Sequence, residues 1–262
     1  ENYLAKPCDS FTFPRTGHVV RNRSVLAAMT NKQSHEDGSI SDQEIKWLNR
    51  RAKGGFGIVT TAAANVSKNG KAWEGEIGLY NDRHIENLIK LVDSVHDHGS
   101  LIFAQLFHGG MKAPESLTGK TPLSASSIPC EESSSGVTRA ASEGDIRTII
   151  QDFTLAADRC VRSGFDGIEL HGAHGYLISQ FLGEKTNLRQ DDWGGDLKAR
   201  SNFLIEIYRS IKNSVPESFI VGVRISPEIE ELGIDLVDSI DLVELLKGEG
   251  VDFLHLSCWD AF

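Results

Sequence analysis

The chain has 262 residues, of which 40% are hydrophobic and 24% charged, and its formal net charge is −10. A chain of this length and composition can bury a sizeable core as one α/β domain. The acidic balance argues against nucleic acid or an anionic membrane surface as the main partner. No apolar run approaches the about 18 residues of a spanning helix, and the start shows no signal-peptide pattern.

The cysteines of the chain are widely spaced and form no C-x-x-C pair. They are Cys8, Cys130, Cys160 and Cys258. This spacing indicates reduced thiols in a cytoplasmic protein rather than a metal site or a disulfide framework.

The predicted elements alternate along the chain between strands and helices. Residues 1–20 are irregular and contain Pro7, Pro14 and Gly17, so we expect a lid or hairpin over one end of the domain. Six largely apolar stretches are predicted as strands. In chain order they are residues 22–29, 56–66, 101–107, 168–170, 219–225 and 251–257.

Helices are predicted between these strands. The first begins at Ser41, whose spacing to Glu44 fits a capping box, and Ser142 and Asp145 have a similar spacing at the start of another. The helices cover residues 41–53, 84–98, 142–160, 197–215 and 237–248. Apolar residues at helical spacing predict the buried faces of the first three. They are Ile45, Leu48 and Ala52 in the first, Ile85, Leu88, Ile89, Val92 and Val95 in the second, and Ile146, Ile149, Ile150, Phe153, Ala157 and Cys160 in the third.

Six alternations of strand and helix predict a parallel sheet, either doubly wound or closed as a barrel. Long loops follow the third strand, over 114–141, and the fourth, to about Gly195. Polar residues stand at the C-terminal ends of the strands, which in a barrel share the face that carries the active site. They are Thr30, Thr61, Gln105, His171 and Arg224.

This grouping, and the lack of a G-x-G-x-x-G turn, favours an α/β fold of the (β/α)8 TIM-barrel type. Six strands cannot close an eight-stranded barrel. We therefore expect residues 1–262 to be a single domain in which only about six βα units are present and the last two are lacking.

The stretch from 164 to 182 carries the densest group of polar rings. His171, His174 and Tyr176 follow the strand within six residues, and Gly172 and Gly175 allow the backbone to bring the rings close. Each ring can donate a hydrogen bond to a developing oxyanion, and the tyrosine can release its proton. The histidines could instead cap the strand while Tyr176 packs. Zinc is a weaker reading, because the usual ligand spacing is absent, and no metal is expected.

Five short motifs stand in order along the chain, each at a strand end or in its loop. They are N-R-x-V-x-A-x-M-T at 22–30, Q-L-x-H-x-G at 105–110, H-x-x-H-G-Y-L at 171–177, F-L-x-x-x-x-N-x-R-x-D-x-x-G-G at 181–195 and V-R-x-S at 223–226. Together they resemble the motifs of the old yellow enzyme family of FMN-dependent NAD(P)H oxidoreductases. The resemblance covers nearly the whole chain.

The resemblance implies a flavin site with FMN bound and NAD(P)H as its reductant. Thr30 would lie near O4 and N5 of the ring, and Thr61 would face the ring through its backbone. The amide of Gln105 can match the pyrimidine edge, and Arg224 suits the charge near N1 and O2 of a reduced flavin. From the residues alone, Gln105 also fits a buried hydrogen bond, and Arg224 fits a salt bridge equally well. The implied cofactor-binding residues are Ala27, Ala28, Met29, Thr30, Thr61, Gln105, His171 and Arg224.

The resemblance also implies reduction of the C=C bond of an electron-poor alkene such as an enone. His171 and His174 would grip the substrate oxygen, hydride would pass from flavin N5 to Cβ, and Tyr176 would protonate Cα. The alternatives are an amine or N-methyl dehydrogenase on the same barrel and a flavin-binding protein without turnover. The partner expected is a small-molecule substrate. The sequence is also compatible with a homo-oligomer.

Two residues depart from the family pattern, and one expected region is absent. Thr30 replaces a cysteine of one subgroup, and Met111 replaces an arginine. The family's phosphate site lies on its seventh and eighth strands, which the predicted elements do not include.

Overall fold

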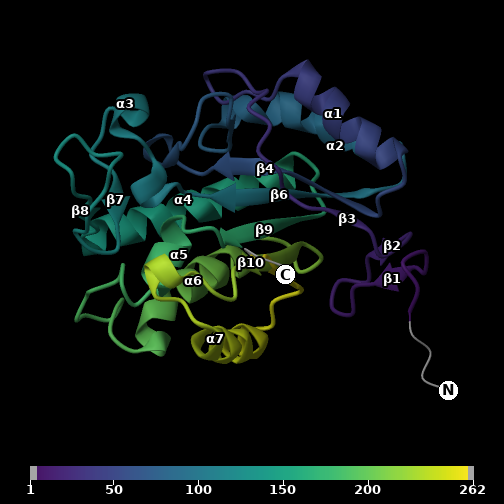
Figure 1. The fold of residues 1–262 in the computed structure, drawn as a ribbon. Helices are drawn as coiled ribbons and strands as arrows, with labels where there is room; N and C mark the ends of the chain where they lie inside the picture. Colours follow the sequence, from purple (N-terminus) through teal and green to yellow (C-terminus); the bar gives the residue numbers. More distant parts are fainter. Residues whose placement is uncertain (1–4, 259–262) are drawn as a thin grey trace.

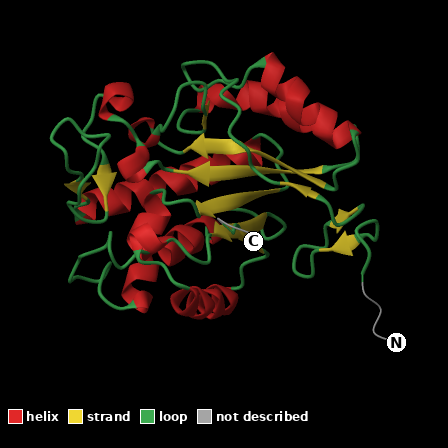
Figure 2. Cartoon of the chain, in the orientation of Figure 1, coloured by secondary structure: helices red, strands yellow, loops and turns green. Residues whose placement is uncertain are grey.

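The principal sheet adds its parallel strands in chain order (Figures 1 and 2). The computed structural model describes residues 5–258, and within them the path runs through β3 (Val25–Leu26), β4 (Ile58–Asn65), β6 (Leu101–Phe107), β9 (Gly167–Gly172), β10 (Ile220–Ile225) and β11 (Leu254–Leu256). The short strand β5 (Ile77–Gly78) also pairs with β4. Because the strand order never reverses, the crossover helices lie on one side and the sheet curls as in a TIM barrel. The predicted fold class is confirmed.

The outer face of this curled sheet is covered by α1 (Asp42–Lys53), α2 (Ile85–His96), α4 (Glu143–Arg162), α6 (Leu197–Lys212) and α7 (Leu236–Glu249). Two short helices, α3 (Glu115–Thr118) and α5 (Leu177–Leu182), lie in the loops that follow β6 and β9. Ser41 caps α1 by accepting from the Glu44 amide, and Ser142 with Asp145 forms a reciprocal capping box on α4. Both predicted helix starts are therefore confirmed.

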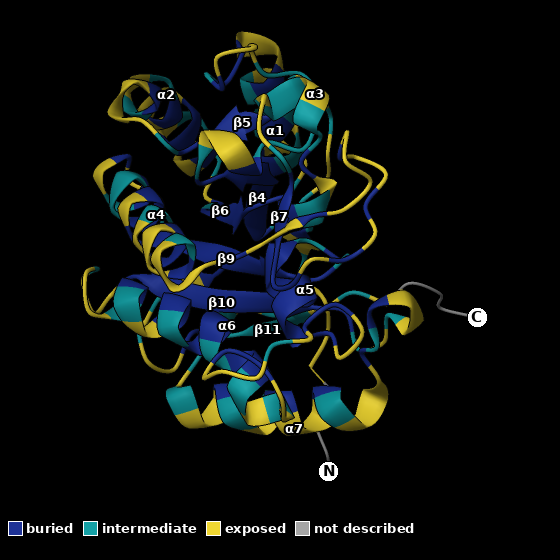
Figure 3. Cartoon of the chain, turned by 90° about the vertical axis from the view of Figure 1, so that its left-hand side faces the viewer, coloured by how far each residue is buried: buried dark blue, intermediate teal, exposed yellow. Residues whose placement is uncertain are grey.

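The core lies between the sheet and the inner faces of the helices, which Figure 3 shows as buried stripes on partly exposed cylinders. All six residues predicted to face the core from α4 are buried. In α2 one residue was assigned to the wrong face, because Ile89 is 38% exposed while Leu91 is buried. At roughly 100° per residue, a stripe centred on Leu88, Val92 and Val95 includes position 91 and leaves position 89 on its flank.

Three predicted segments differ from the structure. The strand predicted over 22–29 is reduced to β3, because β3 is the edge of the sheet and pairs only with β4. The loop predicted to run to Gly195 contains α5, whose six residues are all buried and so show no amphipathic period. The loop over 114–141 carries α3 and a small parallel pair of β7 (Leu123–Ser124) and β8 (Arg139–Ala140).

The N-terminal segment forms the expected hairpin, with β1 (Phe11–Thr12) antiparallel to β2 (Val19–Val20). Phe13 and Val20 pack on Ile58, Phe103 and Ile220 at the start of the barrel strands. The hairpin therefore covers the end of the sheet opposite the polar strand ends.

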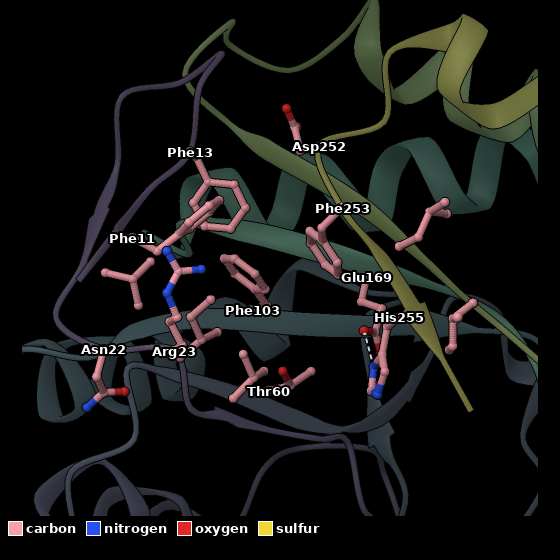
Figure 4. A pocket seen from close by; sticks show the side chains of 15 residues that line it. Phe11, Phe13, Asn22, Arg23, Thr60, Phe103, Glu169, Asp252, Phe253 and His255 are labelled. Atoms are coloured by element: carbon pink, nitrogen blue, oxygen red, sulfur yellow. Dashed lines mark hydrogen bonds and ion pairs between the residues drawn. The ribbon is translucent and has the colours of Figure 1, made fainter. Parts of the chain in front are cut away.

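A cavity of about 380 Å³ lies inside the curled sheet, between its two edge strands β3 and β11 (Figure 4). An eight-stranded barrel has two further strands between such edges. Aromatic rings line one part of the cavity, and Glu169 and His255 lie at another.

The four cysteines are all free thiols. Among the described helices, none is long and apolar enough to cross a bilayer.

Candidate functional site

The turn after β9 places two imidazoles and a phenol at the C-terminal end of the sheet. His171 is the fifth residue of β9 and is buried, and the chain then turns through His174 and Gly175, both with positive φ, at +62° and +76°. A left-handed backbone is unfavourable for a histidine, so the turn needs external support. Ser226 Oγ accepts from the His174 amide at 3.1 Å, and Lys112 Nζ donates to the His174 carbonyl at 2.8 Å.

The three rings predicted from the sequence are brought together by this turn. The ring centroid of His171 lies 4.9 Å from that of His174 and 4.9 Å from that of Tyr176, both edge to face. Tyr176 also packs against Phe107 at 5.1 Å. No residue within the described range 5–258 hydrogen-bonds to the Tyr176 hydroxyl, which leaves this group free for a ligand.

Burial sets the protonation of these rings. Desolvation holds the pKa of His171 well below its usual value, and burial with the nearby charge of Arg224 lowers the pKa of His174 to about 4. Both imidazoles are therefore neutral at pH 7. Burial, with the carboxyl of Glu76, raises the pKa of Tyr176, so its phenol keeps the proton. These three rings therefore present neutral hydrogen-bond donors rather than cations.

The hydrogen bond on one nitrogen of His171 fixes its tautomer. Nδ1 accepts from the Ala173 amide at 3.4 Å, so Nε2 carries the proton. This leaves one donor on His171 for a ligand oxygen.

Arg224, near the end of β10, connects the segment after β3 to the turn that carries His174. One guanidinium nitrogen donates to the Ala28 carbonyl at 3.4 Å and another to Ser257 Oγ at 3.0 Å. Ser257 Oγ lies 2.6 Å from His174 Nε2. The remaining nitrogen of Arg224, Nε, is buried and has no partner in the described part of the protein. A buried N–H without an acceptor is costly, so a ligand atom is expected to face it.

The amide of Gln105 and the hydroxyl of Thr61 lie deeper in the sheet, and both residues are buried. The Gln105 backbone N–H donates to Thr61 Oγ1 at 3.2 Å, and the Gln105 side chain donates to Glu169 Oε1 at 2.7 Å. Thr61 Oγ1 donates to the Ala62 carbonyl next to the irregular register between β4 and β6.

The segment after β3 is more open than the rest of the predicted site. Ala27 and Ala28 are partly buried, and Met29 is 44% exposed. Thr30 is also exposed and makes no hydrogen bond to any residue in the range 5–258. Of this segment, only Ala28 is joined to Arg224 by a hydrogen bond.

Sequence reasoning missed four polar residues of the site. Lys112, Ser226 and Ser257 support His174, and Glu169 binds Gln105. Glu169 was detectable, because it stands two residues before His171 and so lies on the same face of β9. Lys112 directly follows Met111, so the chain supplies a cation one residue after the position where the motif has arginine.

Space for a ligand lies beside His174. A cavity of about 640 Å³ is lined by His174, Gly175, Met111, Lys112, Cys258 and residues 227–232. His174 therefore lines this cavity and is linked to Arg224 through Ser257.

The sequence matches a known protein family over most of its length. Residues 16–261 match the NADH:flavin oxidoreductase / NADH oxidase family. A relative from Bacillus subtilis (strain 168), named a probable NADH-dependent flavin oxidoreductase, is 36% identical over 258 residues. That match covers 97% of this chain and 68% of the relative.

Solved structures are similar over nearly the whole chain as well. The old yellow enzyme homologue from Zymomonas mobilis superposes with a TM-score of 0.88 and 26% identity, over 97% of this chain and 73% of the other. Histamine dehydrogenase from Rhizobium sp. 4-9 gives 0.86 and 27%, over 96% of this chain and 37% of the other.

Proposed function

The chain belongs to the NADH:flavin oxidoreductase / NADH oxidase family, and from that premise we propose that it reduces the C=C bond of electron-poor alkenes such as enones. FMN is the cofactor of this family and NAD(P)H its reductant. The observation that carries the proposal is the pair of neutral imidazoles, His171 and His174, held beside the protonated phenol of Tyr176. That set suits a carbonyl oxygen that gains negative charge.

The polar residues fit FMN. The unpartnered Nε of Arg224 needs an acceptor, and an N1 or O2 atom of the flavin pyrimidine edge is one. The side-chain amide of Gln105 donates one N–H to Glu169, which leaves its second N–H and its carbonyl oxygen for the same edge. Arg224 and Gln105 would therefore hold the pyrimidine end of the cofactor, with Ala27, Ala28, Met29, Thr30 and Thr61 as the remaining contacts.

When bound, FMN supplies hydride transfer, taking hydride from NAD(P)H and giving it to the β carbon of the alkene. His171 Nε2–H and a donor on His174 would bind the carbonyl oxygen of the substrate. Because these donors are fixed before the reaction, they would stabilise the enolate-like oxygen of the transition state more strongly than the carbonyl oxygen of the bound substrate. Tyr176, whose hydroxyl has no protein partner within the described residues, would deliver its proton to the α carbon.

Oxidation of an amine is the second candidate, because histamine dehydrogenase shares the fold over 96% of this chain. Amine oxidation removes hydride from a carbon next to nitrogen and develops no oxyanion. The two neutral imidazoles would then have no charge to stabilise, which favours the alkene reaction.

The test is an anaerobic titration of the purified full-length protein with NADH and, separately, NADPH, followed by cyclohexenone. Loss of the flavin absorption band and its return on adding the enone is the expected result. Bleaching with no return, together with bleaching by histamine or another amine, would replace the proposal by the dehydrogenase. A protein that binds FMN but is bleached by neither nucleotide would be a flavin-binding protein without turnover. Free FMN mixed with the same reagents is the control.

A further inference from the structure

We propose that Glu169 is a positioning residue of the flavin site, which orients the amide of Gln105 and offsets the charge of Arg224, and so lowers the reduction potential of bound FMN. The inference depends on the proposed function only for the binding of FMN at Gln105 and Arg224. No step of alkene reduction enters it.

Glu169 lies inside the curled sheet, on the face that carries His171, and is 3% exposed. Its Oε1 accepts from Gln105 Nε2 at 2.7 Å, and its Oε2 lies 2.8 Å from His255 Nδ1 (Figure 4). A carboxylate that accepts at both oxygens requires the Nδ1 proton on His255. The carboxylate is thus held by side chains from two other strands, β6 and β11.

The contact with His255 passes over a whole strand. The partner of Glu169 on β10 is Gly222, while β11 lies on the far side of β10. Gly222 carries no side chain, and a Cβ there would lie 2.2 Å from the ring of Phe253. Because Gly222 leaves this room, the carboxylate and the Phe253 ring can both occupy the interior above β10. Such an arrangement positions Glu169 more firmly than one hydrogen bond would.

The orientation of the Gln105 amide follows from this carboxylate. An amide can be turned by half a rotation to exchange its oxygen and nitrogen, and only one of the two orientations gives Glu169 a donor. Gln105 Oε1 and the second N–H are thereby left for the flavin. Without Glu169, both orientations of the Gln105 amide become accessible.

Charge is the second effect of Glu169. Arg224 stands two residues after Gly222, the β10 partner of Glu169, so both side chains lie on the same face of the sheet. Burial lowers the pKa of Arg224, and the carboxylate of Glu169 acts in the opposite direction. The two imidazoles nearby, His171 and His174, are neutral at pH 7 and add no charge beside Arg224. The negative charge that acts on the Arg224 guanidinium is therefore that of Glu169. Reduction adds negative charge to the flavin, which Arg224 favours and Glu169 disfavours.

The experiment compares wild type with E169Q and E169L, using FMN affinity from fluorescence quenching and the FMN potential from equilibration with a reference dye. E169Q keeps the shape and an acceptor for Gln105 but removes the charge. The reduction potential of its FMN should rise by about 30 mV or more, which for a two-electron couple is a tenfold change in the equilibrium constant of reduction. E169L should weaken FMN binding by about tenfold or more, and much less than that when Q105L is already present. Neither readout requires an alkene.

The chain offers a matched control at the other end of β9. Like Glu169, Asp166 is a carboxylate that contacts a histidine and accepts from an N–H of β6. It lies 2.8 Å from His96 Nε2 and accepts from the backbone N–H of Ile102 at 2.8 Å. D166N should leave the potential and the FMN affinity unchanged.

An E169Q potential equal to wild type, or fully additive losses in the E169L/Q105L pair, would overturn the inference. Wild-type protein that takes up no FMN would overturn it together with the proposed function. Protein with the shifted potential that reduces no alkene would overturn the proposed function alone.

Discussion

Replacing Tyr176 by phenylalanine separates proton delivery from every structural role of this residue. The ring packs against Phe107, His171 and Trp73, at centroid distances of 5.1, 4.9 and 6.2 Å, and Y176F keeps these contacts. The hydroxyl has no hydrogen-bond partner within residues 5–258, so its removal leaves no buried group unpaired. We therefore expect the free energy of unfolding to change by less than about 0.5 kcal/mol.

The catalytic effect should be far larger. A positioned general acid contributes about 10²- to 10⁴-fold, which corresponds to roughly 2.7 to 5.4 kcal/mol of activation free energy. This loss should fall on the reaction with the enone, because reduction of FMN by NAD(P)H requires no proton from Tyr176. Anaerobic stopped-flow absorbance, with the two half-reactions measured separately, is the assay.

Two results would refute this reasoning. Equal slowing of both half-reactions would show that Tyr176 shapes the flavin site rather than supplying the proton. An unchanged rate with cyclohexenone would assign the proton to another group or to water.

Three further predictions concern stability. S142A removes the cap of α4 and should lower the free energy of unfolding by about 1 kcal/mol, measured by urea denaturation. F153A empties a fully buried position on the same helix and should cost about 3 to 5 kcal/mol in the same assay. The hydrogen bond to Asp166 raises the pKa of His96 above its unfolded value. The stability from this pair is therefore fully present below the unfolded pKa, about 6.5, and is lost as the pH rises through the folded value. The difference in Tm between wild type and D166N should shrink from pH 5 to pH 8, and a constant difference would contradict the linkage.

The elements that sequence reasoning placed well carry a clear local pattern: a one-sided apolar stripe with a cap in α4, and a nearly continuous apolar run in β6. Helix α4 shows a 3.6-residue apolar period and a capping box, and the bounds of β6 agree residue for residue with the predicted strand. Helix α5 was missed because it is buried all round, and β3 was drawn too long because an edge strand forms only as far as its neighbour pairs with it. In both cases the deciding factor is tertiary, and no local pattern records it.

The candidate site divides in a similar way. His171, His174 and Tyr176 stand close in sequence, so their proximity could be predicted from one motif. The supports of His174 come from three other segments, at Lys112, Ser226 and Ser257. A lysine or serine at these positions has many possible partners. The register of β9, β10 and β11 selects the partner of the two serines, and the turn after β6 selects that of the lysine.

Glu169 shows where such register could have been inferred. Alternation along β9 puts its side chain on the face of His171, inside a barrel, where a carboxylate needs partners. Gln105 is the residue opposite it on β6, and both are polar. Gly222 on β10 is the third member of the same row, and a glycine facing the interior of a barrel leaves room for a neighbouring side chain. Glu169 thus stands between a carboxamide on β6 and a glycine on β10. Such a pattern predicts that the second partner of the buried carboxylate lies beyond the glycine, on the next strand.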